Sequence, residues 1–200
     1  MAYRAAGQIL TLVVALVTTS LSSSAHAGPA TDALKPEIDQ VIAVLQNPAL
    51  KGESKAAERR QALHGVTDSV FDWTEMAKRA LGRHWAARSP AEQEEFVGLF
   101  RDLLERAYVG KIERYTGEPI TYTGETSDGS QTTVRTKILT RQGQEIGIDY
   151  RMLREGDRWR IYDVQVEGIS LVNNYRTQFD GIIKTSSYEE LIKRLKARAS

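Results

Sequence analysis

A block of alternating apolar and polar residues lies between two helical stretches, and this order limits the folds that the chain can adopt. Residues 30 to about 115 are rich in Ala, Glu, Arg and Leu, and residues 118–166 are rich in Thr, Val, Ile and Tyr. Residues 170–198 return to a helical pattern, and no Pro-, Gly- or Ser-rich linker separates the blocks. This order predicts one α+β domain, with helices packed on an antiparallel sheet.

The central block predicts four antiparallel strands joined by short turns. Apolar and polar side chains alternate along it with a period of two residues. Gln142-Gly143 and Glu155-Gly156-Asp157 are turn signals, so the strands around them form hairpins. One buried and one solvated face predicts a curved sheet that cups the helices. The expected strands lie around residues 120–122, 134–141, 145–152 and 159–166.

Capping residues mark the ends of the expected helices. The strongest start signal is Ser89, followed by Pro90 at the first helical position and Glu92 at the third. Asp72 opens a short helix that Gly82 ends. Similar signals end a first helix at Asn47-Pro48 and open a last one at Ser187.

The first 27 residues have the features of a cleaved signal peptide. Arg4 is their only charge, the apolar run 9–17 follows, and Ala25-His26-Ala27 has the small-x-small pattern that signal peptidase reads. The run is shorter than the roughly 20 apolar residues that span a bilayer. We therefore expect residues 28–200 to form a single soluble domain in the periplasm.

Composition excludes several classes of protein. Lys+Arg number 27 and Asp+Glu number 26, a formal net charge of +1, which argues against nucleic-acid binding because that needs an excess of clustered cations. The absence of cysteine excludes disulfides, thiolate metal sites and cysteine nucleophiles. His64 and His84 lack metal-binding spacing, and no nucleophile elbow or phosphate-binding loop is present. No metal or cofactor is expected.

Asp163 leaves one enzymatic alternative open. It lies inside an otherwise apolar strand, where a buried carboxylate could act as a general base in a small cone-shaped α+β enzyme. The more ordinary interpretation makes Asp163, or Glu167 close behind it, a partner for Arg176 or for a backbone turn. The sequence offers no clear second catalytic group beside Asp163.

Strings along the whole expected domain resemble one family. Residues 71–85 read FDWTEMAKRALGRHW, and residues 167–179 read EGISLVNNYRTQF. They are similar to the motifs DFxxMAxxxLGxxW and EGVSLVxxYRxQF of the MlaC family of periplasmic phospholipid-transport proteins. The family often has Phe where Trp73 stands, and this difference keeps an aromatic ring. The segment WRIYDV at 159–164 continues the resemblance between the two motifs.

The resemblance implies a fold like that of nuclear-transport-factor-two proteins, with a curved sheet and helices around an apolar cavity for lipid tails. It also implies a phospholipid as cargo and a carrier rather than an enzyme. Implied partners are an outer-membrane lipoprotein complex and the substrate-binding ring of an inner-membrane ABC transporter. A related branch is associated with hopanoid lipids, and the motifs do not separate the two. We expect a monomer.

Inward-facing apolar side chains would line such a cavity. From the helices we expect Trp73, Met76, Phe96, Phe100, Leu103 and Tyr108; from the sheet Val134, Ile138, Ile148, Tyr150, Trp159 and Val164; and from the last segment Tyr175 and Phe179. A non-lipid interaction module with a filled core remains an alternative, because periodicity alone does not separate a packed core from a hollow one.

Overall fold

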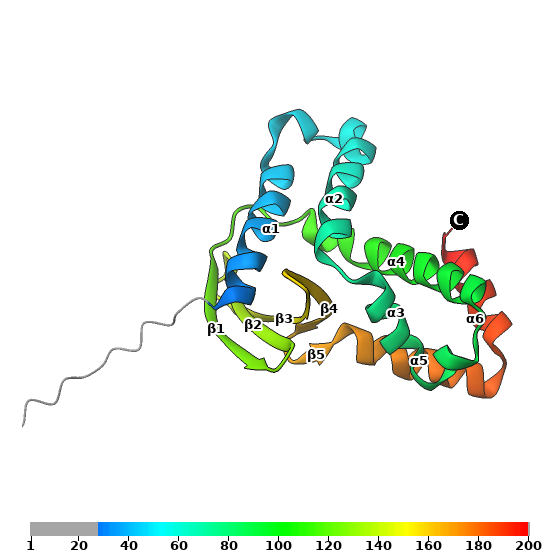
Figure 1. The fold of residues 1–200 in the computed structure, drawn as a ribbon. Helices are drawn as coiled ribbons and strands as arrows, with labels where there is room; N and C mark the ends of the chain where they lie inside the picture. The colour runs from blue at the N-terminus through cyan, green and yellow to red at the C-terminus, as the bar shows by residue number, and fades with distance from the viewer. Residues whose placement is uncertain (1–27, 200) are drawn as a thin grey trace, which may run out of the picture.

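Five antiparallel strands form one curved sheet in the order β1-β2-β3-β4-β5, with helices grouped in two places around it (Figure 1). The computed structural model describes residues 28–199, so the predicted signal peptide lies outside the described residues. The strands are β1 (Ile120–Asp128), β2 (Gln131–Leu139), β3 (Glu145–Glu155), β4 (Arg158–Val166) and β5 (Ile169–Ser170). The α+β class and the antiparallel sheet are confirmed.

The fifth strand corrects the expected count of four. β5 has two residues, and they pair with Gln165 and Val166 at the end of β4. Between them the chain reverses through Glu167 and Gly168, both of which have positive φ. Two residues are too short to show an alternating pattern, so sequence periodicity does not reveal such a strand.

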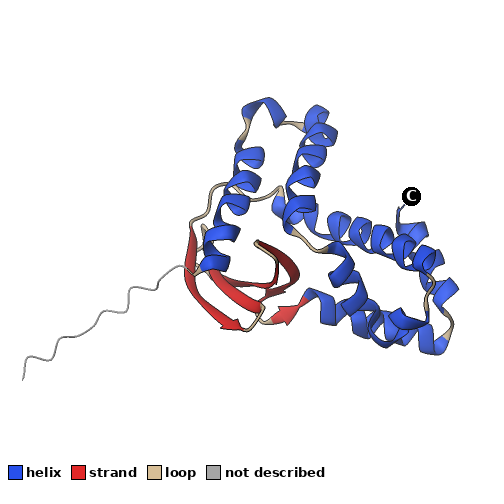
Figure 2. Ribbon diagram, viewed as in Figure 1, coloured by secondary structure: helices blue, strands red, loops and turns tan. Residues whose placement is uncertain are grey.

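The helices form two separate groups (Figure 2). α1 (Pro29–Gln46) and α2 (Ala56–Val70) stand as a hairpin over one face of the sheet, joined by the short turns η1 (Pro48–Leu50) and η2 (Glu53–Lys55). The second group lies beside the sheet and contains α3 (Trp73–Leu81), η3 (Gly82–Ala87), α4 (Pro90–Ile112), α5 (Leu171–Thr185) and α6 (Tyr188–Ala199). Within residues 28–199, no helix combines the length and the apolar character needed to cross a membrane.

Local signals place the helix ends where they were predicted. Ser89 and Glu92 form a capping box, in which each side chain bonds the other's backbone N–H. Asp72 accepts a hydrogen bond from the backbone N–H of Glu75, 2.8 Å away. α3 ends at Gly82, whose φ of 57° suits a residue without Cβ. These caps set where α4 and α3 begin and end.

Register sorts the strand residues onto two faces. Val134, Tyr150 and Val164 are direct neighbours across β2, β3 and β4, and therefore share a face. Their chain neighbours Arg151 and Asp163, which also pair, point to the other face. Bulges lie at Tyr122/Gly124 and at Arg151/Met152, where the register shifts, and such bulges increase the local twist of a sheet.

Candidate functional site

The second helix group encloses a closely packed aromatic core. Phe96 and Phe100 of α4 meet Tyr175 and Phe179 of α5 edge to face, with ring centroids 5.6 to 5.8 Å apart. Both phenylalanines of α4 have no exposed surface. This geometry is favourable for aromatic pairs, so the cluster holds the helices together and leaves almost no surface to a ligand.

A second, smaller cluster lies where the α1–α2 hairpin covers the sheet. Leu34 of α1 and Val70 of α2 pack with Val134, Met152 and Ile161 of the strands, and all five are buried. The N-terminus of α1 is fixed to β1, because Glu125 accepts hydrogen bonds from the backbone N–H and the hydroxyl of Thr31, at 2.8 and 2.7 Å. The hairpin is thus anchored at its base, on the sheet.

Beyond this second cluster, apolar side chains on the same sheet face stay only half-buried. The register carries them across the strands, since Ile120 pairs with Ile138 and Ile138 pairs with Ile146. On α1, Val41 and Leu45 continue the helical stripe of Leu34 toward its C-terminus. We call this surface the apolar wall. Its half-buried members are Val41, Ile42 and Leu45 of α1, Val66 of α2, and Ile120, Tyr122, Ile138, Ile146, Ile148, Tyr150, Val164 and Val166 of the sheet.

Two tyrosines of the apolar wall are surrounded by protein although their side chains keep accessible surface. Burial raises the pKa of Tyr122 to about 12, with a further contribution from the carboxylate of Asp39 on α1. Burial also raises the pKa of Tyr150 far above its ordinary value. A shift with this cause marks surroundings of low polarity. These two tyrosines of the apolar wall therefore lie in surroundings of low polarity and keep part of their surface accessible.

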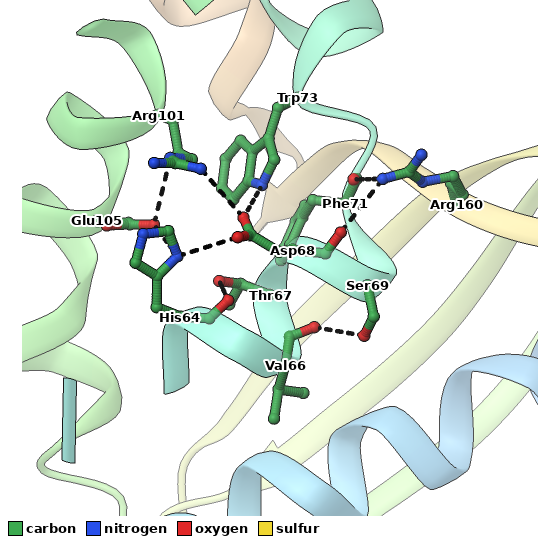
Figure 3. A network of polar contacts seen from close by, with 10 residues as sticks. All are labelled: His64, Val66, Thr67, Asp68, Ser69, Phe71, Trp73, Arg101, Glu105 and Arg160. Atoms are coloured by element: carbon green, nitrogen blue, oxygen red, sulfur yellow. Dashed lines mark hydrogen bonds and ion pairs between the residues drawn. The ribbon is translucent and has the colours of Figure 1, made fainter. Parts of the chain in front are cut away.

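A polar seam joins α2 to α4 beside the apolar wall. We define it by Arg59, His64 and Asp68 of α2 and by Arg101, Glu105 and Glu113 of α4. Nη2 of Arg59 lies 2.8 Å from Oε1 of Glu113. Arg101 donates to Asp68 over 3.3 Å, and Nδ1 of His64 lies 3.3 Å from Oε1 of Glu105 (Figure 3).

In the polar seam, neighbouring positive groups offset only part of the cost of burying the carboxylate of Glu105. Burial raises the pKa of Glu105, while His64 and Arg101 act in the opposite direction. Val70 of α2 belongs to the second, smaller cluster, and the buried residues Phe96, Phe100 and Leu104 of α4 belong to the helical core. Desolvation offsets much of the attraction between partly buried charges. The polar seam therefore stabilises the contact between α2 and α4 less than either apolar cluster stabilises its own elements.

Asp163 has a structural environment. Its Oδ2 accepts from the hydroxyl of Ser170 over 2.6 Å, and its Oδ1 accepts from the backbone N–H of Val172 over 3.1 Å. Arg151 is the nearby cation, with Nη1 at 3.7 Å from Oδ2. In the described part of the chain, Arg176 makes no hydrogen bond or ion pair with Asp163 or Glu167. The carboxylate thus holds the turn into α5, one of the roles expected for it, and its cation is Arg151 rather than Arg176.

His84 also has a structural partner. Its Nε2 lies 2.9 Å from Oδ1 of Asp180 on α5. Arg83 contacts the same oxygen at 2.6 Å, and Lys184 contacts Oδ2 at 2.8 Å. Hydrogen bonds from Lys184 and His84 hold the pKa of Asp180 well below its usual range. This cluster ties η3 to α5. Among residues 28–199, no group of three or more His, Cys, Asp or Glu side chains is placed to hold a metal ion.

The residues predicted to line a cavity fall into different surroundings, and their contact with a ligand stays a prediction. Met76, Phe96, Phe100, Tyr175 and Phe179 lie in the helical core, and Val134 lies in the second, smaller cluster under the α1–α2 hairpin. Half-buried positions beside these two clusters belong to Trp73, Leu103, Tyr108 and Trp159. The apolar wall contains Ile138, Ile148, Tyr150 and Val164.

Several members of the apolar wall were not expected from the sequence. The spacing of Ile38, Val41, Ile42 and Leu45 identifies a helix, but not the surface that the helix faces. Tyr122 marks the first strand without revealing that Asp39 of α1 lies close enough to affect its hydroxyl. Alternation could have added Ile120 and Ile146, because both share a strand face with predicted residues.

Comparison with known proteins gives a consistent assignment. The family model described as "MlaC protein" matches residues 35–197 of this chain. The Haemophilus influenzae intermembrane phospholipid transport system binding protein MlaC is 24% identical over 127 residues, 61% of this chain and 59% of that protein. The Pseudomonas putida toluene tolerance protein ttg2D is 24% identical over 120 residues, 59% of this chain and 56% of that protein. The matches thus span less than two thirds of either relative.

A solved structure has the same fold. A phospholipid-binding protein from Ralstonia solanacearum, determined in complex with a phospholipid, aligns with a TM-score of 0.76 and 24% sequence identity. The alignment covers 84% of this chain and 95% of that protein. Helices and sheet are therefore arranged alike in the two proteins.

Proposed function

This chain belongs to the MlaC protein family, and on that premise we propose that it binds a phospholipid as a component of a lipid transport system. The family model covers most of the chain, and relatives over part of its length are named as phospholipid transport or toluene tolerance proteins. The structural relative binds a phospholipid. The apolar wall is the feature of this chain that supports the proposal.

The apolar wall suits acyl chains because it is open and apolar at once. The helical core around Phe100 offers almost no surface, whereas Ile138, Ile148 and Tyr150 keep part of theirs. Exposure of apolar surface to water is unfavourable by about 25 cal/mol per Å², so an apolar ligand that covers the wall is stabilised there. We propose that the acyl chains lie against the wall, between the sheet and the α1–α2 hairpin.

The energetics of transfer explain why a protein is needed. Exposing one CH₂ group to water costs about 0.8 kcal/mol, so a chain of about 16 carbons costs roughly 13 kcal/mol. A carrier with an apolar wall removes most of this cost, yet it need not bind the chain more tightly than a bilayer does. We propose that the protein carries lipid through the periplasm between an outer-membrane complex and an inner-membrane ABC transporter.

Native mass spectrometry of protein purified from the periplasm, followed by organic extraction, tests the cargo. We expect added mass that resolves into phospholipid and gives the number of acyl chains. Extraction of a hopanoid would assign the protein to a hopanoid-associated branch instead. A mass without ligand, together with no uptake from phospholipid vesicles, would contradict lipid binding and favour an interaction module.

Two neighbouring strand residues test the apolar wall itself. Ile138 belongs to the wall, whereas Leu139 is 45% exposed and, as the next residue of β2, points to the other face. Ile138→Trp should reduce bound lipid several-fold, because the larger ring takes the space of an acyl chain. Leu139→Trp is the matched control and should retain full loading. Equal loading of the two folded variants would show that the lipid lies elsewhere.

A further inference from the structure

A polar cleft lies on the face of the sheet opposite the apolar wall. It has a volume of about 610 Å³ and lies between β3, β4 and the helices α3 and α5. Its side chains include Arg79 of α3, Arg151 of β3 and Arg176 of α5, with Tyr162, Asp163 and Asn173. Arg151 follows the wall residue Tyr150 along β3, and Asp163 precedes the wall residue Val164 along β4. Because successive side chains of a strand point to opposite faces, the sheet separates the cleft from the apolar wall.

The ring of Tyr162 holds two of these arginines. The guanidinium carbon of Arg79 lies 4.2 Å from the ring centroid, and that of Arg151 lies 5.3 Å from it. Tyr162 itself is 2% exposed, so it provides a fixed support. Stacking on an aromatic ring orients the planar guanidinium group and spares its N–H donors for a ligand.

The arginines keep donors that no carboxylate uses. Arg79 gives its Nε to Glu75 over 2.7 Å. Among the described residues, the one ion pair of Arg151 is the 3.7 Å contact with Asp163, whose two oxygens already accept from Ser170 and Val172. Arg176 forms no hydrogen bond or ion pair with any other residue that the structure describes. Three arginines and one carboxylate, that of Asp163, line the cleft, and Glu75 outside the lining pairs with both Arg79 and Lys78. The lining therefore has an excess of positive charge and of guanidinium donors.

We propose that this cleft binds the phosphate group of a small polar ester. Guanidinium groups match the several oxygens of a phosphate, and more than one of them can donate to it at once. The volume exceeds that of a bare ion, and Asn173 and Asn174 add neutral polar groups to the lining. Since that lining does not suit an acyl chain, the alcohol part is polar, as in a glycerol phosphate. The proposal does not depend on lipid binding at the apolar wall.

Backbone NMR spectra of the purified protein, titrated with glycerol 3-phosphate, test the cleft. We expect saturable shifts at residues 162–165 and 172–177. Arg176→Gln should weaken binding about tenfold, as expected for the loss of a charge-assisted hydrogen bond. Arg176 is exposed on α5, so this variant should keep its fold, which circular dichroism checks. Arg151→Gln should have a similar effect, and Arg158→Gln, an exposed arginine outside the cleft lining, is the charge-matched control.

A second titration, with soluble dihexanoylphosphatidylglycerol, separates the two sources of such a phosphate. Shifts in the cleft with this lipid alone would assign the cleft to a lipid headgroup, and equal binding of glycerol 3-phosphate would assign it to a free ester. The proposal is overturned if all variants bind glycerol 3-phosphate equally, or if shifts are spread over exposed cations everywhere. It is also overturned if a tetraglutamate peptide binds the same residues more tightly, because the cleft would then fit an acidic protein segment.

Discussion

Asp163 accepts hydrogen bonds through both of its carboxylate oxygens. One accepts from Val172 in the first turn of α5 and the other from Ser170, which itself caps that helix through Asn173. The side chain of Asp163 is 3% exposed. If it is removed, the N–H of Val172 and the hydroxyl of Ser170 lose their acceptor at a place that water hardly reaches. A carboxylate in an apolar strand thus has a structural explanation here.

At this residue we predict a stability effect. Asp163→Ala should lower the free energy of unfolding by about 2–3 kcal/mol, because a buried backbone N–H and a hydroxyl lose their acceptor. Urea denaturation measures the change. Asp149→Ala, on the same strand face and with half-buried surface, should change it by no more than about 0.5 kcal/mol. Equal effects of the two substitutions would contradict the capping role of Asp163.

Among the elements, the α1–α2 hairpin has unequal attachments. Its base is packed on the sheet through Leu34 and Val70, whereas its far end is held by polar contacts. There Arg59 reaches the carbonyl of Leu50 in η1 over 2.8 Å as well as Glu113 of α4. Arg59 therefore links the connection between α1 and α2 to the second helix group.

Arg59→Gln should loosen this far end of the hairpin. The side chain of Arg59 is 15% exposed, and its removal leaves Glu113 and the Leu50 carbonyl without their donor. We expect a loss of about 1–2 kcal/mol in unfolding free energy. Hydrogen–deuterium exchange should become faster in residues 47–55.

The neighbouring pair Lys55–Glu58 provides the control for this experiment. Both of its side chains are largely exposed, at 43% and 56%, so Lys55→Gln should cost at most about 0.5 kcal/mol. If exchange in residues 47–55 is unchanged by Arg59→Gln, the arginine does not hold this connection.

At the scale of the whole molecule, the two apolar regions differ in how completely they are packed. The helical core is filled and supplies stability, whereas the apolar wall keeps surface that packing could have buried. Two substitutions test this difference. Phe100→Ala should cost about 3–5 kcal/mol in unfolding free energy, and Ile148→Ala should cost about 1 kcal/mol, because its side chain is only half-buried.

Phe100→Ala should have the larger effect on stability, whereas Ile148→Ala should have the larger effect on stabilisation by lipid. A ligand stabilises the folded state in proportion to the logarithm of its concentration over its dissociation constant. Thermal unfolding with and without bound phospholipid should show a smaller lipid-induced rise in Tm for Ile148→Ala, and an unchanged rise for folded Phe100→Ala. The opposite pattern would place the lipid in the helical core.

The sequence by itself determined the features that depend on near neighbours. The cap at Ser89, the stop at Gly82 and the hairpin turns are set by residues a few positions apart, so the helices, the antiparallel strands and the α+β class were predictable. The string resemblance to the MlaC family was also available from the chain alone. The two-residue strand β5 was not predicted, because its pairing with β4 depends on the chain reversal at Glu167 and not on a sequence pattern of its own.

Only the tertiary structure decided which apolar side chains are packed and which stay open. Phe100 and Ile148 look alike by periodicity, since both face inward on an amphipathic element. The difference arises because the helices of the second group together cover Phe100 completely, whereas α1 and α2 cover the sheet fully only near their base. The meeting of Arg79, Arg151 and Arg176 at one cleft has the same origin. Contacts between residues far apart in the chain depend on how whole elements pack, and local patterns do not contain that information.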